Sequence, residues 1–282
     1  MSCRTVAALA LFLPLQGPAK PVERLTAWPA PANKDALLVE VEKLCKARTP
    51  EMAVQARESL QATGAASVPF LLDRLGRERD EDAVLRVKEV LKEVTTAEQT
   101  RLLAKEFGSR FETVRTFVLW RAASFPDPEI RPTAEAAWKR VEKAGAKIDP
   151  EERYAAALCA TSSGSLVGLE MLQDAAQSKW DRRGEEIRSA LEGARGPEAT
   201  KLVLVRLKDA DQKRKVAVLR VLAGCGDKSA LPAVKTFLDD DDNQIRVAAI
   251  NACRGIVDGE PPQEQLPVFE AIEIAKKWKE KI

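Results

Sequence analysis

Carboxylates are the most conspicuous residues in this chain that could do chemistry. Four consecutive aspartates occupy positions 239–242, and Asp209 and Asp211 form a smaller cluster upstream. Such a run could ligate calcium, but it lacks the glycine and the distal glutamate of an EF-hand loop. Aspartate also accepts hydrogen bonds from the free N–H groups at the start of a helix. We therefore favour helix capping over a calcium site.

The 282 residues include no histidine. This excludes Ser-His-Asp and Cys-His catalysis, histidine general bases and histidine-ligated metals. Lysine or carboxylate mechanisms remain open, yet there is no glycine-rich phosphate loop and no nucleophile elbow. No carboxylate pair stands out for acid–base work. The sequence thus offers no catalytic, cofactor-binding or metal-ligating candidate, and we expect a protein that is not an enzyme and has no cofactor.

The five cysteines give no metal-binding or redox motif, because none of them forms a C-x-x-C pair. Cys225 and Cys253 fall at positions typical of a helical core, where free cysteine behaves as a small buried hydrophobe. The alternative, in an oxidising compartment, is a disulfide between these two residues, which requires their Cα atoms to lie within about 7 Å.

A repeated pattern indicates the elements that position these residues. Residues 238–246 read Leu-x-Asp-x-Asp-x-x-Ile-Arg, and residues 207–215, 31 positions upstream, read Leu-x-Asp-x-Asp-x-x-Arg-Lys. Each copy continues as an amphipathic run and reaches a glycine, Gly224 or Gly255. A self-similar unit of about thirty residues is typical of a stacked repeat protein.

Fainter copies continue in phase, with arginine or lysine at positions 57, 86, 115, 153, 188, 215 and 246 and steps of 27 to 38 residues. Proline follows an aliphatic residue in the second half of three units, where it marks the first turn of a helix. The predicted structural repeat positions are Asp80, Asp82, Arg86, Arg115, Arg188, Asp209, Asp211, Asp240, Asp242, Arg246, Pro69, Pro232 and Pro267.

Each unit therefore consists of a helix, a tight turn, a second helix and an acidic turn. A leading helix is expected near 35–47. The seven first helices are predicted near 51–62, 82–94, 111–123, 150–161, 183–192, 212–223 and 243–256. The second helices are predicted near 66–76, 97–107, 128–143, 165–177, 197–207, 228–238 and 263–280. Short amphipathic pairs cannot bury their apolar faces alone, so we expect them to stack around one continuous core.

The stretch 238–249, Leu-x-Asp-x-Asp-x-x-Ile-Arg-x-x-Ala, followed by Gly255, resembles a HEAT repeat. The resemblance is strong over 207–257, fair over 53–95 and weak between 99 and 195. It implies an all-α, right-handed α-solenoid of about seven stacked helix pairs, here covering residues 35–282. It also implies that the protein binds partners, often along a concave side lined by the second helices.

The N-terminus differs from the repeats. Residues 6–15 carry no charge, and small residues surround a possible cleavage position after Ala19. Residues 1–19 therefore resemble a secretory signal peptide, which predicts export to the periplasm or the extracellular space. The alternative is an apolar N-terminus on a cytoplasmic protein. Residues 20–34, rich in proline, are predicted to form an extended linker in which Trp28 either docks on the first helices or is exposed.

The net charge of +2 is close to neutral and therefore does not indicate nucleic-acid binding. Basic runs at 182–183, 213–215 and 276–279 are interpreted as solvated helix faces, with a phosphate-binding ridge as the alternative. Ten uncharged residues are too few to cross a bilayer, which needs roughly 20, so no transmembrane segment is expected.

We expect a non-catalytic, exported scaffold that binds another protein through its second-helix face, at 131–142, 165–177 or 197–206. Trp120, Trp138 and Trp180 either fill wide gaps between helices or serve as exposed anchors for that partner. One alternative is an enzyme like the bilin lyases that have HEAT-like folds. The other is a protein that binds the cell wall or a membrane surface through its Lys276–Lys281 end.

Overall fold

The computed structural model describes residues 22–208, 210–263 and 265–282, and every regular element in them is helical. α1 (Lys34–Lys46) leads the stack. The first helices of the seven pairs are α2 (Pro50–Thr63), α4 (Glu81–Val94), α6 (Glu112–Ala123), α8 (Pro150–Ser162), α10 (Trp180–Gly193), α12 (Gln212–Cys225) and α14 (Asn243–Cys253). The second helices are α3 (Val68–Arg77), α5 (Thr100–Ala104), α7 (Arg131–Ala144), α9 (Leu169–Ser178), α11 (Pro197–Leu204), α13 (Leu231–Lys235) and α15 (Val268–Lys281).

The predicted all-α stack of helix pairs is confirmed. Short 3-10 turns extend α5, α11 and α13 toward their predicted lengths, and a π-helical segment (Arg254–Asp258) extends α14. α15 begins five residues later than predicted, because the preceding chain is held in an extended path. There the side chain of Asn251 accepts a hydrogen bond from the Gln263 amide and donates one to the Gln263 carbonyl.

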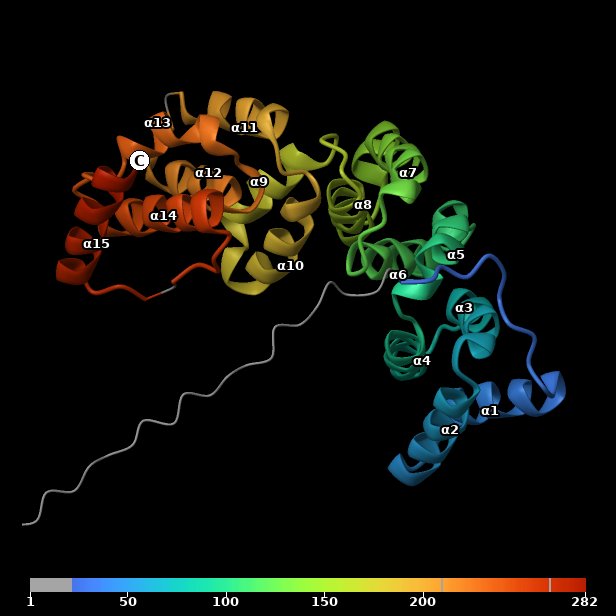
Figure 1. The fold of residues 1–282 in the computed structure, drawn as a ribbon. Coiled ribbons are helices and arrows are strands. Elements are labelled where there is room, and N and C mark those ends of the chain that lie inside the picture. Colours follow the sequence, from blue (N-terminus) through green and yellow to red (C-terminus); the bar gives the residue numbers. More distant parts are fainter. Residues whose placement is uncertain (1–21, 209, 264) are drawn as a thin grey trace, which may run out of the picture.

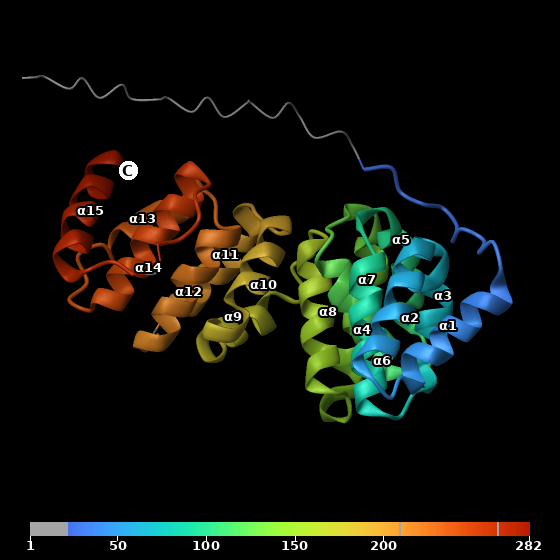
Figure 2. The same cartoon turned by 90° about the horizontal axis from the view of Figure 1, so that it is seen from below.

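The pairs form a curved, elongated stack with α1 and α15 at opposite ends (Figures 1 and 2). In Figure 1 the second helices α5, α7, α11 and α13 lie along the outer side of the arch, whereas α4, α6, α10, α12 and α14 lie along its inner side. The expectation that second helices line the concave side is therefore wrong for these four helices. The candidate contact segments 131–142 and 197–206 belong to the outer layer, whereas segment 165–177 falls largely on α9, which packs against α8, α10 and α12. We call the side formed by the first helices the inner face.

One apolar core runs through the stack from Leu37 in α1 to Trp278 in α15. Successive first helices pack against each other along most of the stack. Examples are α6 with α8 and α12 with α14. The pair α4 and α6 is the exception, because these helices do not pack closely; α6 packs instead against α3 and α5. The stack thus opens on its inner face between the second and third pairs.

Glycines spaced 31 residues apart allow the first helices of the C-terminal pairs to approach each other closely. A Cβ atom on Gly193 would lie 2.2 Å from the Ser162 carbonyl oxygen of α8, and one on Gly255 would lie 2.2 Å from the Ala223 carbonyl oxygen of α12. A Cβ atom on Gly224 would meet Leu191 of α10 at 2.7 Å. Each glycine thus lets its own pair sit directly against the pair before it.

Aspartates begin the first helices as the capping interpretation requires. Asp80, Asp211 and Asp242 are the N-cap residues of α4, α12 and α14, and each accepts hydrogen bonds from backbone N–H groups of the first turn. Asp82 lies exposed in the first turn of α4, and Asp240 accepts from the Asp242 amide. Asp209 lies outside the described residues. Pro69 and Pro232 lie in the first turns of α3 and α13, and Pro267 immediately precedes α15.

Several of the recurring arginines bind backbone carbonyl groups at the turns. Arg246 donates to the carbonyl oxygen of Asp240 at 2.7 Å, and Arg115 donates to that of Ser109 at 2.8 Å. Arg86 instead reaches the last carbonyl groups of α1, at Leu44 and Cys45. Arg188 differs from these, because its guanidinium lies 5.9 Å from the ring centre of Trp180. The equivalent positions therefore do not share one environment.

A buried ion pair joins three helices in the middle of the stack. Glu152 of α8 is fully buried and accepts two hydrogen bonds from Arg115 of α6, at 2.7 and 2.9 Å. Arg140 of α7 approaches the same carboxylate at 2.7 Å. Burial, the largest influence, raises the pKa of Glu152, but the hydrogen bonds and charges of the two arginines together outweigh it and lower the pKa.

The predicted linker is extended but not free. Arg24 donates to the Pro126 carbonyl and the Thr100 hydroxyl and lies 3.4 Å from the buried carboxylate of Asp127, which also binds Arg101. The Leu25 amide donates to the Glu98 carbonyl. Trp28 is half-buried and packs against the core. Residues 22–33 thus form a strap across the second and third pairs before α1 begins. The predicted signal peptide, residues 1–19, lies outside the described residues.

The four described cysteines are buried free thiols. Cys225 and Cys253 are not joined, so the alternative of a disulfide between them is wrong in this structure. Burial, the largest influence, raises the pKa of each of these two thiols to about 12. Both therefore remain protonated at neutral pH and act as small apolar side chains of the core.

We expect Glu152→Ala to lower the free energy of unfolding by about 3–5 kcal/mol, because it leaves two arginine charges without their buried partner. Glu142→Ala, at an exposed position of α7, is the matched control and should change stability by less than about 0.5 kcal/mol. Urea unfolding followed by circular dichroism measures both. Equal stability of the two variants would show that the buried pair does not hold the helices together.

Candidate functional site on the inner face

Two cavities open on the inner face, and first helices line both. The first, which we call the wedge groove, lies where α4 and α6 separate and encloses about 170 Å³. It is lined by Lys88, Lys92, Thr116, Phe117, Trp120, Glu151, Tyr154, Ala155 and Arg183, from α4, α6, α8 and α10. Four consecutive repeats thus contribute to one small depression.

Aromatic rings stacked under cations form the walls of the wedge groove. Lys92 of α4 places its ammonium 4.9 Å from the ring centre of Trp120, and Arg183 of α10 lies 4.1 Å from that of Tyr154. Such cation–ring pairs each contribute roughly 0.5–2 kcal/mol, depending on how far they are removed from water. The ring faces are thereby held in position across helices that belong to different repeats.

Glu186 of α10 holds the rings of Trp120 and Tyr154 in place through hydrogen bonds. Its carboxylate accepts a hydrogen bond from Trp120 Nε1 at 3.4 Å and another from the Tyr154 hydroxyl at 3.2 Å. Burial is the largest influence on Tyr154 and raises the pKa of its hydroxyl, and the charge of Glu186 raises that pKa further. Arg183 acts in the opposite direction but does not cancel these effects. Tyr154 is therefore a neutral donor at every physiological pH.

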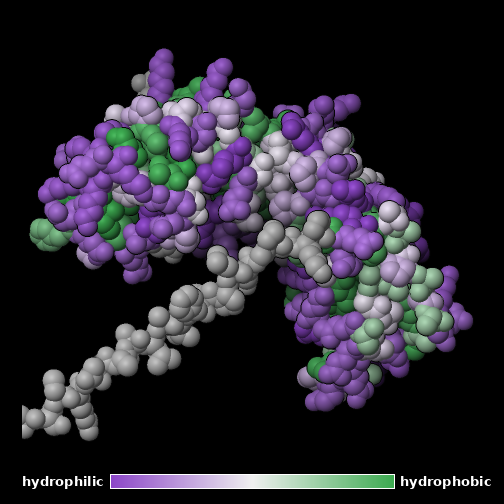
Figure 3. Space-filling view, viewed as in Figure 1, coloured by the Kyte–Doolittle hydropathy of each residue, from purple (hydrophilic) through white to green (hydrophobic). Residues whose placement is uncertain are grey.

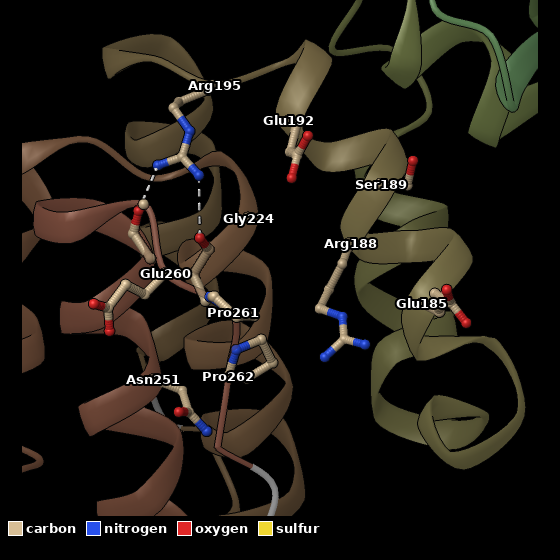
Figure 4. A pocket seen from close by; sticks show the side chains of 13 residues that line it. Glu185, Arg188, Ser189, Glu192, Arg195, Gly224, Asn251, Glu260, Pro261 and Pro262 are labelled. Carbon is tan, nitrogen blue, oxygen red and sulfur yellow. Dashed lines mark hydrogen bonds between the residues drawn. The ribbon is translucent and has the colours of Figure 1, made fainter. Parts of the chain in front are cut away.

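The second cavity, which we call the C-terminal cleft, encloses about 500 Å³ between α10, α12, α14 and the extended segment after α14 (Figure 4). Glu185, Arg188, Ser189 and Glu192 of α10 form one wall. The opposite wall consists of Asn251 and residues 259–262. Figure 4 shows Arg188 extending between these two walls.

The walls of the C-terminal cleft are fixed by arginines that bind backbone carbonyl groups. Arg195 donates to the carbonyl oxygens of Gly226 and Gly255 at 3.1 and 3.0 Å, which ties the ends of α12 and α14 together. Arg254 binds the Pro261 carbonyl and pairs with Glu260 at 2.8 Å. The charges of this cleft are therefore largely used within the protein and leave a mixed, slightly acidic lining.

The surface around the cavities is mainly hydrophilic, and apolar residues reach it in scattered groups (Figure 3). Among the residues that the structure describes, no group of three or more Cys, Asp or Glu side chains is arranged to hold a metal ion. Of the aspartates at 239–242, Asp242 caps α14 and Asp239 pairs with Lys279 at 2.6 Å. None of the described helices is long and apolar enough to span a bilayer.

The sequence pointed to some of these residues but not to their arrangement. Trp120, Trp138 and Trp180 are expected either to fill gaps or to anchor a partner, and all three are half-buried against the core. Trp120 and Trp180 lie on first helices, whereas Trp138 lies on the outer helix α7. Of the predicted repeat positions, Arg188 lines the C-terminal cleft. The sequence does not distinguish Glu186 or Lys92 from the other charged residues of their helices. Their contacts with Trp120 and Tyr154 come from other repeats, and the residues next to them in the chain do not reveal these contacts.

Comparison with known proteins identifies the repeat. The family of HEAT repeats matches residues 200–272, from α11 to the start of α15. No curated protein and no solved structure matches the chain. The family match over residues 200–272 and the stacked helix pairs along the described chain together support a HEAT-repeat protein. HEAT repeats commonly mediate protein–protein interaction, so the coarse function they indicate is that of an interaction scaffold.

The neutral state of Tyr154 gives a direct test of the wedge groove. Tyr154 is the only tyrosine, so the ultraviolet absorbance of tyrosinate reports this side chain alone. Its pKa is raised in the folded protein, so it contributes stability that is present below about pH 10, the ordinary tyrosine value, and is lost as the pH rises through the folded-state pKa. The folded chain should therefore show little tyrosinate at pH values where the urea-unfolded chain is half ionised.

Glu186→Gln should move the tyrosine titration toward the ordinary value, because it removes a negative charge that opposes ionisation. Glu185→Gln, on the adjacent residue of α10 and exposed, is the matched control and should leave the titration unchanged. A folded wild-type chain that titrates like the unfolded one would contradict the contact between Tyr154 and Glu186.

Proposed function

We propose that this protein is a non-catalytic, exported scaffold that binds another protein along its inner face. The observation that carries the proposal is the position of the two cavities. Both open on the first-helix side, and each is built by residues from three or more repeats. The curvature of a solenoid creates an extended concave surface of the kind that such proteins use for binding.

The composition of the inner face supports a protein as the bound partner. Protein interfaces are enriched in tryptophan, tyrosine and arginine, which form most binding hot spots. Trp120, Tyr154 and Arg183 meet in the wedge groove. Trp180 of α10 has the guanidinium groups of Arg188 and Arg220 at 5.9 and 4.8 Å from its ring centre. Rings that are braced by neighbours lose little conformational freedom on binding, which favours their use as anchors.

Export remains a proposal that is supported by the uncharged segment at 6–15 and the small residues before Lys20. The strap adds a structural argument. Its first fixed contacts involve Arg24 and Leu25, so a cut after Ala19 would leave every strap contact of the described chain in place. Cleavage at that position is therefore compatible with the fold.

Site-directed photo-crosslinking in the native cells tests both parts of the proposal. A photoreactive residue at Ser189, exposed on α10 at the inner face, should capture a partner protein. The same photoreactive residue at Thr133, exposed on the outer helix α7, is the matched control and should capture none. Mass spectrometry of the recovered chain should give Lys20 as its first residue.

Three results would each overturn a part of the proposal. Capture from Thr133 but not from Ser189 would place the binding surface on the outer layer, and capture from neither would remove the scaffold function. An intact Met1 on the recovered protein would contradict export while leaving the inner-face proposal in place.

A further inference from the structure

The wedge groove has the size of one side chain. Small-molecule sites usually enclose about 300–1,000 Å³, whereas this groove encloses about 170 Å³. Its base is formed by Phe117 and Ala155, both core residues with at most 4% exposure. A depression of this size with an apolar base suits a single inserted side chain of a longer chain lying across the face.

The interior of the groove is apolar in effect, although Trp120 and Tyr154 both carry polar groups. The indole N–H and the phenol hydroxyl both donate to Glu186. Their hydrogen-bonding groups are thus already satisfied within the protein, and the rings add apolar surface to the groove. An inserted side chain therefore gains most if it is aliphatic or aromatic.

The rim of the groove, in contrast, has positive charge available. Arg183 is paired with Glu151 at 2.6 Å, which leaves Lys88 and Lys92 on the α4 side. Lys92 contacts the Trp120 ring, and neither lysine has a carboxylate partner among the residues that the structure describes. Lys279 near the C-terminus, by comparison, is paired with Asp239. Charge complementarity therefore calls for carboxylates on the ligand.

We propose that the wedge groove binds an acidic segment of the partner protein, with one apolar side chain inserted between Trp120 and Tyr154 and flanking carboxylates paired with Lys88 and Lys92. This inference rests on the proposed function and specifies the chemistry of its partner. The apolar side chain supplies the desolvated anchor, and the carboxylates orient the segment across α4 and accelerate its encounter with the groove.

A nucleic acid fits the same surface less well. Binding a phosphate backbone needs a track of basic residues, because each neutralised phosphate contributes to affinity. The groove offers two available lysines, and Glu89, Glu93 and Glu186 lie on the same helices α4 and α10. A short peptide with a few carboxylates matches this limited positive charge.

A peptide array on the full chain provides the test. The central residue is Phe, Leu, Trp, Ala or Ser, and the flanking residues are all Glu, all Lys or all Ser. We expect binding that requires both an apolar centre and Glu flanks, and that weakens as salt is raised. A single-stranded DNA oligonucleotide of the same charge as the Glu peptides should not compete for the groove.

Variants then locate the binding. Lys88→Glu with Lys92→Glu should weaken binding of the acidic peptide by about tenfold or more, since reversing rim charges opposes complementarity. Lys105→Glu with Lys201→Glu, exposed in the outer layer, makes the same charge change and should leave binding unaltered. Thr116→Phe, which fills the groove without changing charge, should remove the preference for an apolar centre. Circular dichroism melting confirms that each variant is folded.

Equal binding of the acidic peptide to Lys88→Glu/Lys92→Glu and to the control pair overturns the inference, as does an array with no preference for Glu flanks. Competition by the oligonucleotide would replace the peptide with a nucleic acid. These outcomes are separable from the proposed function. A partner captured at Ser189 in cells that binds the lysine variant normally would leave the scaffold in place and remove only the acidic segment.

Discussion

The structure depends on one constraint, which is that no helix pair in this chain can bury its apolar side alone. Each pair is short and amphipathic, and its core residues become buried only against the pairs on either side. The glycines at 193, 224 and 255 show how closely the neighbours must approach, since any larger side chain there would meet the preceding first helix. Stacking is thus the condition for folding, and the curved shape with an inner face follows from it.

Polar groups at the junctions are arranged so that stacking leaves few of them unpaired. Aspartates satisfy N–H groups at helix starts, and arginines satisfy carbonyl groups at helix ends and turns. Where α4 and α6 fail to pack closely, Arg121 of α6 still binds the Thr95 carbonyl at the end of α4. The separation is therefore a fixed feature of the stack, and the wedge groove is its consequence.

The sequence was sufficient to predict the helices because their signals are local. The Asp-x-Asp turns, the prolines of first turns and the recurring glycines each act within a few residues, and the fifteen α-helices of the described chain lie within or close to the predicted ranges. The family resemblance, by contrast, assigned the concave side to the wrong layer. Which layer is inner is decided by small rotations between pairs, and no single motif encodes them.

Contacts between distant residues account for the rest of what the sequence did not reveal. Arg24 binds Asp127 and the Pro126 carbonyl across more than a hundred residues, so a proline-rich stretch that looked like a free linker is a strap. The wedge groove combines residues from α4, α6, α8 and α10. Its key carboxylate, Glu186, differs from other glutamates of α10 in that it accepts hydrogen bonds from Trp120 and Tyr154. Patterns along the chain describe repeats well, but they do not show where two repeats separate.

Amide hydrogen exchange, measured helix by helix in the wild-type chain and in Leu219→Ala, tests most directly whether the pairs are stabilised by stacking. Leu219 is fully buried in α12, and its truncation should cost about 2–5 kcal/mol. If each pair is completed by its neighbours, α10, α12 and α14 should lose protection while α2 and α4 keep theirs. An equal loss of protection in every helix would instead describe a single cooperative globule and would contradict the account.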